Sequence, residues 1–342
     1  MTTYYTDGTL ATGANDGTSW ADAWQGAAGL QMLCDTLTAG DVGYIRNTFT
    51  LAAAIDIDVA SGTDGNPIRV IGCNAAGDVD GTKVLIDGDG AAANCLATDG
   101  QDFWYWDNVE FANATGHNVN ASAEADDWRF HRCSSHDAGD AGFGGYWRRC
   151  LFSYTEAYNN IDGIDYSRDS MYIGCGFYNN SGNGVNCIYS NVFSNCWIHN
   201  NGTYGVYIDG NGAISFDHCV IDGNQAVGLR IIWGQILIRG CMFTNNVTRA
   251  LWLDDASCTD LNNIFINNGT DIFGSAAFSD DKGVTTRITS GTVGYEDQAN
   301  DKFSRIVGAA GYRTEVDIGG GNYLRFCPGL PTLILPRVED QG

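Results

Sequence analysis

The chain has 342 residues, among them 45 Gly and only 4 Pro, and its 18 Lys and Arg against 41 Asp and Glu give a formal net charge of −23. This charge argues against binding to a nucleic-acid backbone or an anionic membrane, and no apolar run reaches the ~18–20 residues of a membrane span. Abundant Gly with recurring Asn-Gly and Asp-Gly pairs is typical of short strands joined by tight turns. We therefore expect an all-β protein that has neither nucleic acid nor membrane as a partner.

Residues 1–45 predict an N-terminal cap followed by the first strand. Apolar residues from Trp20 to Cys34 recur at helical spacing, and Thr18 and Ser19 are available as an N-cap. Residues 1–7 have neither the basic start nor the apolar core of a signal peptide. We therefore expect synthesis in a cytoplasm, with the alternative that Met1 stands where a signal has been removed.

Three short sequence motifs between residues 39 and 90 resemble those of a known protein family. Residues 39–46 read Ala-Gly-Asp-Val-Gly-Tyr-Ile-Arg, residues 61–68 read Ser-Gly-Thr-Asp-Gly-Asn-Pro-Ile, and residues 86–88 read Ile-Asp-Gly. This series resembles the opening coils of right-handed parallel β-helix proteins related to pectate lyases and to alginate or chondroitin lyases. The resemblance implies that architecture for most of residues 1–275. It implies little about activity, because these turns build the coil.

A short sequence motif recurs about every 22 residues in the second half of the chain. Its cysteines at 175, 196, 219 and 241 are 21, 23 and 22 residues apart, a period that is typical of a stacked solenoid. Extending the alignment places one inward column at Val109, Cys133, Cys150, Cys175, Cys196, Cys219, Cys241 and Asn263. Asparagines five residues after the later members predict a ladder that closes each turn, at Asn180, Asn201, Asn224, Asn246 and Asn268.

Each repeat holds three short strands, one before the cysteine, one after it and one after the asparagine. We therefore predict an all-β fold, a right-handed single-stranded parallel β-helix of roughly ten coils with an N-terminal capping helix and a C-terminal extension. The predicted parts are 1–45 as cap and first strand, 46–280 as the parallel β-helix, and 281–342 as a C-terminal cap or attachment segment.

The cysteines are interpreted as reduced, buried thiols. The six in the inward column, Cys133 to Cys241, lie on neighbouring strands ~4.8 Å apart, whereas a disulfide needs Cβ atoms ~3.8 Å apart. Six others lie off the column and leave a bridge open: Cys34, Cys73, Cys95, Cys187, Cys258 and Cys327.

No metal site and no cofactor are predicted, since the chain has no Cys-x-x-Cys pair of the kind that zinc sites favour. The acidic turns at residues 78–81 and 87–90 leave calcium open as an alternative to ordinary solvated turns.

The strands after the asparagines place a polar and aromatic column on the outer face. Strand alternation points Asp165, Asn186, Tyr207, Arg230 and Trp252 outward in successive coils. Aromatic, amide, guanidinium and carboxylate groups on one face suit a sugar chain, so this column is the candidate glycan-binding site or subunit interface. Ordinary solvated side chains are the alternative.

The catalytic candidates are Asp209, Asp254 and Arg230. The two aspartates are two coils apart, about 9–10 Å at the strand spacing, which is near the upper limit for the carboxylates of an inverting glycosidase. β-Helix lyases resemble one another in using a Lys or Arg base beside bound calcium. In this chain Lys83, Lys282 and Lys302 all lie outside the regular coils from 101 to 275.

These observations lead to two candidate functions. The first is a virion structural and adhesion protein, such as a phage capsid decoration, fibre or tailspike-like β-helix that binds host-surface glycans. It would be made in the host cytoplasm and would assemble as a homo-oligomer, a trimer, or with other virion proteins. The alternative is a secreted polysaccharide lyase or glycoside hydrolase. We favour the first because no catalytic set is recognisable in the sequence.

Overall fold

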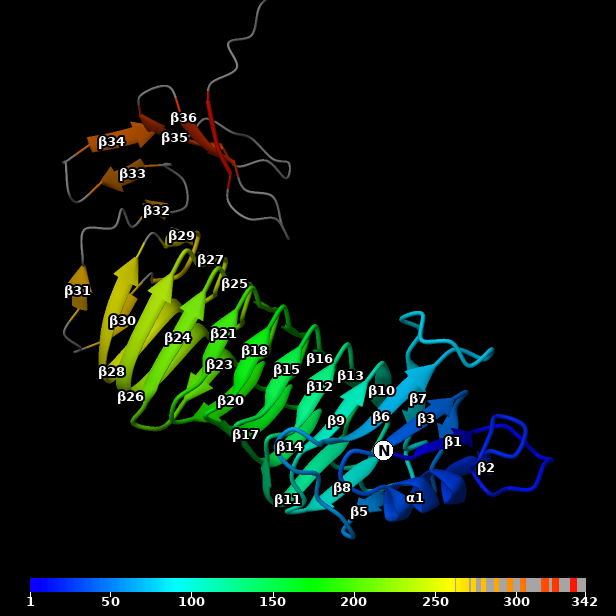
Figure 1. Ribbon diagram of the computed structural model, residues 1–342. Coiled ribbons are helices and arrows are strands. Elements are labelled where there is room, and N and C mark those ends of the chain that lie inside the picture. Colours follow the sequence, from blue (N-terminus) through cyan, green and yellow to red (C-terminus); the bar gives the residue numbers. More distant parts are fainter. Residues whose placement is uncertain are drawn as a thin grey trace, which may run out of the picture.

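The protein is a parallel β-helix (Figure 1), described from a computed structural model. The structure describes residues 1–261 and 263–270, and further along the chain the backbone strands from β30 to β37. Successive coils run from the N-terminal end, where the helix α1 lies, to β29. The predicted fold class is therefore confirmed, and the coil count differs slightly from the ten or so expected.

Each coil contributes one strand to each of three parallel stacks, which we call A, B and C in chain order. Stack A contains β1 (Thr3–Asp7), β3 (Val42–Arg46), β6 (Ile68–Cys73), β9 (Trp104–Asp107), β12 (Arg129–His131), β15 (Leu151–Ser153), β18 (Met171–Ile173), β21 (Val192–Ser194) and β24 (Ala213–Asp217). Stack B contains β4 (Phe49–Thr50), β7 (Val84–Asp87), β10 (Val109–Ala112), β13 (Ser134–His136), β16 (Glu156–Tyr158), β19 (Gly176–Tyr178), β22 (Trp197–His199), β25 (Val220–Asp222), β27 (Met242–Thr244), β29 (Ile264–Ile266) and β32 (Thr286–Ile288). Stack C contains β5 (Ile55–Ile57), β8 (Leu96–Asp99), β11 (Val119–Asp126), β14 (Phe143–Arg148), β17 (Ile164–Arg168), β20 (Val185–Ile188) and β23 (Tyr204–Ile208).

Two long strands join stacks C and A towards the C-terminal end. β26 (Val227–Arg239) pairs first with β23 and then with β24, and β28 (Arg249–Leu261) pairs with β26 along its length. β30 (Ile272–Gly274) and β31 (Phe278–Asp280) pair with the two halves of β28.

Antiparallel strands replace the parallel pattern near the C-terminus. They form a hairpin of β33 (Gly294–Asp297) and β34 (Lys302–Arg305), and a sheet of β35 (Glu315–Gly319), β36 (Asn322–Arg325) and β37 (Leu333–Pro336). Apart from these strands and β32, the predicted cap or attachment segment at 281–342 lies outside the described residues.

The N-terminal helix α1 is shorter than the sequence pattern suggested. It spans Gly26–Thr36, whereas the prediction began at Trp20. Trp24 and Gln25 instead form the strand β2 (Trp24–Gln25), which pairs with β1, so this part of the apolar pattern is used in a ladder. The helix packs on β1, β2, β4 and β5 and buries Leu30 and Leu33 at the open end of the coil.

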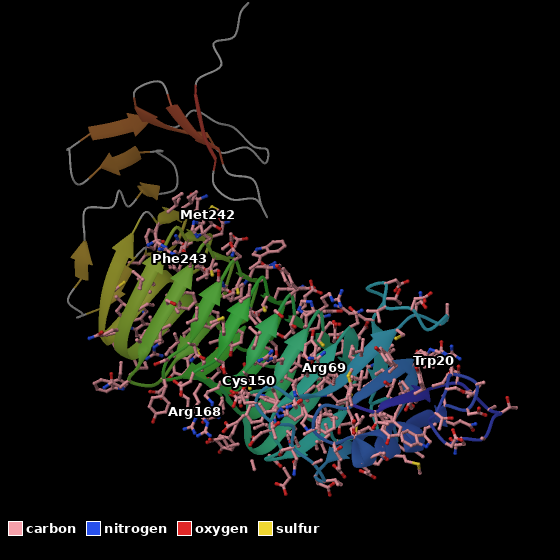
Figure 2. All side chains as sticks on the ribbon, in the orientation of Figure 1. Trp20, Arg69, Cys150, Arg168, Met242 and Phe243 are labelled. Carbon is pink, nitrogen blue, oxygen red and sulfur yellow. The ribbon has the colours of Figure 1, made fainter. Side chains whose placement is uncertain are left out.

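The core is built from columns of like side chains that repeat from coil to coil. On the inner face of stack A, Phe130, Phe152, Tyr172, Phe193 and Phe216 are stacked ring on ring, with centroids 4.5–5.2 Å apart. Each such pair contributes about 0.5–1.5 kcal/mol beyond the area it buries. Side chains line the β-helix along its length, from Trp20 at the N-terminal end to Met242 and Phe243 near the other end (Figure 2).

The predicted inward column is wrong at one coil. Cys150 precedes β15 at the corner between stacks C and A, where its neighbours are Trp128 and Ser170. The position equivalent to Cys133 and Cys175 is held by the buried Thr155. Thr155 lies 22 residues after Cys133 and 20 before Cys175, whereas the alignment through Cys150 required gaps of 17 and 25.

The same slip affects the next inward position. Phe152 belongs to the aromatic column of stack A, and Ala157 takes the place in stack B between Ser135 and Phe177.

The six cysteines of the predicted inward column are all buried and free. They are Cys133, Cys150, Cys175, Cys196, Cys219 and Cys241. Burial raises the pKa of the Cys133 thiol to about 12 and that of Cys196, Cys219 and Cys241 well above the ordinary value. Because the thiolate is the reactive form, these side chains act as small apolar core residues.

The asparagines form a continuous ladder at the corner between stacks B and C. Each side-chain NH2 donates to the Oδ1 of the asparagine in the next coil, at 2.9–3.3 Å, in the order Asn160, Asn180, Asn201, Asn224, Asn246 and Asn268. The same Oδ1 accepts the backbone N–H of the preceding asparagine, as Asn201 does for Asn180 at 3.2 Å. Asn160 was missed in the sequence because the shifted alignment moved its coil out of register.

Replacing one rung of the ladder is expected to destabilise the fold strongly. Asn201→Ala leaves the backbone N–H and side-chain NH2 of Asn180 and the carbonyl of Phe177 without their partner. At about 1–3 kcal/mol for each buried polar group left unpaired, we expect a loss of at least ~3 kcal/mol in the free energy of unfolding, measured by urea titration. The neighbouring exposed Asn200, replaced by Gly, is the control and should change stability far less, since Gly suits its φ of 55°. Equal losses for both variants would contradict the role of the ladder.

Candidate functional site

The outward column predicted from the sequence is present on stack C. Pairing places Asn186 beside Tyr207, Tyr207 beside Arg230 and Arg230 beside Trp252, on the adjacent strands β20, β23, β26 and β28. Asp165 joins the column on β17, where its Oδ1 accepts a hydrogen bond of 2.7 Å from the Asn186 side chain. The strand register alone thus brings all five residues together.

Contacts within this column occupy the groups that a sugar would need. The Arg230 guanidinium carbon lies 4.0 Å from the centre of the Trp252 ring, and that of Arg249 lies at the same distance. Arg230 also donates to the hydroxyl of Tyr204 at 2.9 Å and to a carboxylate oxygen of Asp254 at 3.1 Å. Trp252 is therefore stacked with protein guanidinium groups, and the C-terminal half of the column is tied to itself.

Of the three catalytic candidates, Arg230 and Asp254 are in contact, and Asp209 lies two coils from Asp254. Asp209 follows β23 and is exposed, whereas Asp254 lies on β28 and forms an ion pair with Arg230. Strand β26 lies between β23 and β28, so the two aspartates stay two coils apart, as the sequence suggested.

The N-terminal end of the column is acidic. Burial, with the nearby charge of Asp162, raises the pKa of Asp165 to about 6, against the opposing effect of the hydrogen bond from Asn186. Burial also raises the pKa of Asp162, whose oxygens accept hydrogen bonds from the backbone and side chain of Asn183. At neutral pH both charged forms are therefore disfavoured by their surroundings.

This raised pKa predicts a pH-dependent stability. The folded protein binds a proton at Asp165 more tightly than the unfolded chain does, so the stabilisation is complete below about pH 4 and is lost as the pH rises through about 6. Asp165→Asn keeps the acceptor for Asn186 and removes the charge. We expect it to raise the urea midpoint above that of the unmodified protein at pH 8 and to leave it nearly equal at pH 4. The exposed Asp209→Asn is the control, and equal effects at both pH values for Asp165→Asn would contradict the assignment.

A hollow of about 300 Å³ lies on the outer side of stack A, above β12, β15 and β18. Charged side chains of both signs line it, together with apolar groups such as Met171: Asp64, Asp127, Arg129, Arg149 and Asp169. A second, shallower hollow of about 610 Å³ lies at the corner between stacks B and C and is lined by the turn residues Asp89, Asn113, Asp137 and Asn159. The first hollow offers charged donors as well as acceptors.

Arg129 and Arg69 are the unusual members of this face. They point outward from β12 and β6 on either side of Tyr105 on β9, and both are exposed. Neither guanidinium has an ion pair or hydrogen bond to any side chain in the part of the chain that the structure describes. In a chain of net charge −23, two such arginines make a local positive surface.

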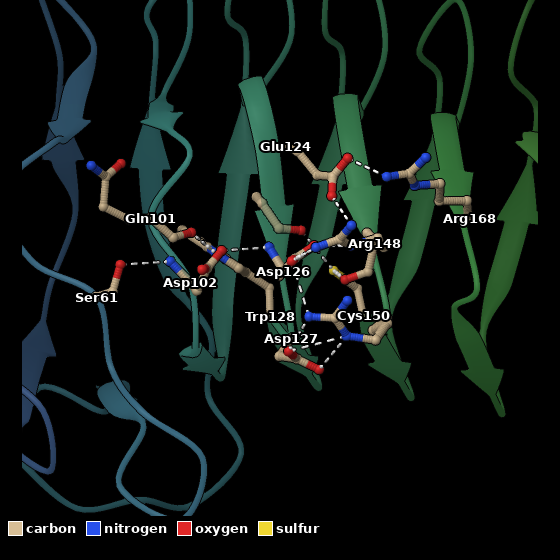
Figure 3. A network of polar contacts seen from close by, with 12 residues as sticks. Ser61, Gln101, Asp102, Glu124, Asp126, Asp127, Trp128, Arg148, Cys150 and Arg168 are labelled. Atoms are coloured by element: carbon tan, nitrogen blue, oxygen red, sulfur yellow. Dashed lines mark hydrogen bonds and ion pairs between the residues drawn. The ribbon is translucent and has the colours of Figure 1, made fainter.

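The arginines around the hollow are, by contrast, fixed by carboxylates. Arg149 donates to Asp127 at 2.8 Å and to Asp126 at 2.9 Å, and this pairing raises its pKa further. Figure 3 shows Arg148 and Arg168 both reaching to Glu124, while Arg148 also contacts Asp126. The backbone N–H of Asp126 donates to Asp102 at 2.9 Å, which ties the network to the preceding coil. These ion pairs hold Asp127 and Arg149 in place at the edge of the hollow.

No group of three or more His, Cys, Asp or Glu side chains is arranged to hold a metal ion within the described residues. In each turn where calcium was an alternative, one carboxylate is engaged internally: Asp80 accepts from Asn74 and Thr82, and Asp87 from Asp89 and Asn113. None of the helices in the described residues is long and apolar enough to cross a membrane.

Sequence reasoning missed Arg69, Arg129 and the hollow. Strand alternation could have placed both arginines on the outer face. What it could not show is that they lack partners while Arg132 pairs with Asp107, because pairing depends on which side chains meet in neighbouring coils.

A family model described as "Right handed beta helix region" matches residues 59–236 and 192–293. None of the curated protein sequences matches this chain. Among solved structures, pectate lyase Pel9A has a TM-score of 0.58 and 18% identity, covering 83% of this chain and 80% of its own. The alginate lyase from Paenibacillus sp. str. FPU-7 has a TM-score of 0.56 and 12% identity, covering 80% and 99%.

A third structure, ORF18 of Geobacillus virus E2, has a TM-score of 0.52 and 12% identity, covering 94% of this chain and 68% of its own. At these identities the likeness shows the fold alone. The structures that share this fold include both polysaccharide lyases and a phage protein.

Proposed function

We propose that this chain, which belongs to the right-handed β-helix family, is a virion adhesion protein that holds a glycan in the hollow above β12, β15 and β18. The observation that carries the proposal is the unpaired guanidinium of Arg129 in a concave site where Asp127 and Arg149 are fixed by an ion pair. Binding sites of this kind combine a shaped surface with a few convergent polar groups. Here the carboxylates accept hydrogen bonds from sugar hydroxyls and the free guanidinium donates.

The free guanidinium of Arg129 favours a glycan that carries carboxylates, while Asp64, Asp127 and Asp169 line the same hollow. The whole chain is acidic and repels such a ligand at long range. Arg69 and Arg129 supply local positive charge without the need for a bound cation, and guanidinium groups bind carboxylates through paired hydrogen bonds.

A virion role is supported by the ORF18 structure of Geobacillus virus E2, which has this fold across 94% of the present chain. On this proposal the protein is made in the host cytoplasm and assembles as a homotrimer or with other virion proteins. We expect light scattering to give a mass near three times the 36.7 kDa of the chain. A monomer encoded beside sugar-utilisation genes would contradict the virion role.

A secreted polysaccharide lyase or glycosidase is the second candidate. The observation in its favour is the group of carboxylates with perturbed pKa values on stack C, Asp162 and Asp165, since such shifts cluster at active sites. The arrangement of Asp209, Asp254 and Arg230 adds little to it, because Arg230 is held by Asp254 and Tyr204.

Removing the free guanidinium is expected to weaken glycan binding. A charge-assisted hydrogen bond contributes about 1.5–3 kcal/mol, so Arg129→Ala should reduce affinity for alginate or pectin oligosaccharides about tenfold or more, measured by calorimetry. Arg239→Ala is the matched control, because that exposed arginine lies on the same long face and is already paired with Asp217. Equal binding by both variants would contradict the site.

The same mixtures test the second candidate. If the unmodified protein generates new reducing ends or unsaturated sugars from alginate, pectin or neutral glycans, the chain is an enzyme, and Asp165→Asn, Asp209→Asn and Asp254→Asn identify the carboxylate involved. Binding without turnover on all of them is the result expected for an adhesion protein.

A further inference from the structure

We propose that three exposed tyrosines, Tyr146, Tyr166 and Tyr189, form a second sugar-contacting surface, which we call the tyrosine ridge. Its ligand is the uncharged face of sugar rings in the same carboxylated glycan, beyond the unit that the hollow holds. This inference rests on the proposed glycan-binding function, and it extends the site from one hollow to a line along the coil axis.

The ridge runs from the outer face of stack C to its corner with stack A. Tyr146 lies in β14, Tyr166 in β17 and Tyr189 directly after β20, three strands that are neighbours in stack C. Their side chains are 56%, 47% and 45% exposed. The rings of Tyr146 and Tyr166 are 5.8 Å apart, close to the ~4.8 Å between coils. Tyr146 and Tyr166 therefore lie side by side, and Tyr189 lies in the next coil, one residue beyond the pair that Arg168 and Ile188 form.

The backbone indicates that stability does not explain these residues. Tyr166 and Tyr189 have φ angles of 54° and 57°, in the left-handed region where Gly, Asn and Asp are favoured. At the corner that holds Tyr189 the chain uses Asp127, Arg149 and Asp169 with similar φ angles, whereas Tyr166 lies within β17. A tyrosine in this conformation with nearly half its side chain in water gains little from burial. An exposed ring held on a disfavoured backbone points to a role at the surface.

The surroundings of the ridge favour a sugar over an apolar protein partner. Arg148 and Arg168 each lie two residues after a ridge tyrosine, and both pair with Glu124 (Figure 3). A line of aromatic rings beside fixed guanidinium and carboxylate groups provides stacking together with hydrogen bonds to hydroxyls. The centre of a protein interface is instead depleted of charge.

The ridge also borders the hollow. Arg149 and Asp169, which line the hollow, directly follow Arg148 and Arg168 in the chain. A glycan whose carboxylate is bound at Arg129 therefore has its neighbouring units within reach of this corner.

The test uses alginate oligosaccharides of two lengths, a disaccharide and an octasaccharide, with the full chain. Tyr166→Asn and Tyr189→Asn, combined, place a residue that tolerates the left-handed backbone at each position. We expect an unchanged or higher melting temperature, unchanged binding of the disaccharide, and roughly tenfold weaker binding of the octasaccharide. Trp197→Ala is the matched control, since this tryptophan is 51% exposed on stack B, away from the ridge.

The outcomes distinguish failure of the tyrosine ridge from failure of the proposed glycan-binding function. If the double variant binds the octasaccharide like the unmodified protein while Arg129→Ala does not, the ridge is wrong and the hollow stands. If the unmodified protein binds neither oligosaccharide, both proposals are overturned. A matching loss in Trp197→Ala also contradicts the ridge, because it would show that any exposed ring contributes equally.

Discussion

The β-helix depends on the hydrogen-bonded registration of one coil on the next. Backbone ladders fix the three stacks, and the asparagine ladder from Asn160 to Asn268 fixes the corner where the chain turns from stack B to stack C. Because each asparagine satisfies buried groups in two coils, a rung cannot shift without leaving polar groups unpaired in both. The register at this corner is therefore held by side chains as well as by the backbone.

That register also decides the outer surface. Side chains alternate along a strand, so each inward residue that is fixed by packing fixes its outward neighbours as well. Arg69, Tyr105 and Arg129 meet on stack A for this reason, as do Asp165 and Asn186 on stack C. Whether a residue in such a column is available to a ligand is a separate matter, because Arg230 is engaged by its neighbours and Arg129 is not.

The outer faces of stacks C and A carry similar residue types, but these residues make different contacts on each face. On stack C, Trp252 and Arg230 stack on each other and Asp254 completes the contact, which gives a cohesive surface. On stack A and its corner with stack C, ion pairs link carboxylates to Arg148, Arg149 and Arg168, and leave Arg129 and the tyrosine rings facing water. An acidic protein thereby presents a free guanidinium and exposed aromatic rings on one side, and the proposed adhesion function rests on these groups.

The sequence by itself determined the solenoid, its period and most of the asparagine ladder, because buried positions that repeat from coil to coil select the same residue type. It failed at Cys150, since corners between strands vary in length and a cysteine at the wrong corner mimicked the repeat. Only the tertiary structure decided that Thr155 holds that position, that Trp252 is covered by guanidinium groups, and that Arg129 and the tyrosine ridge are open. Surface side chains pair with residues of neighbouring coils, about twenty positions away in the sequence. A local sequence pattern therefore does not predict which of them are paired.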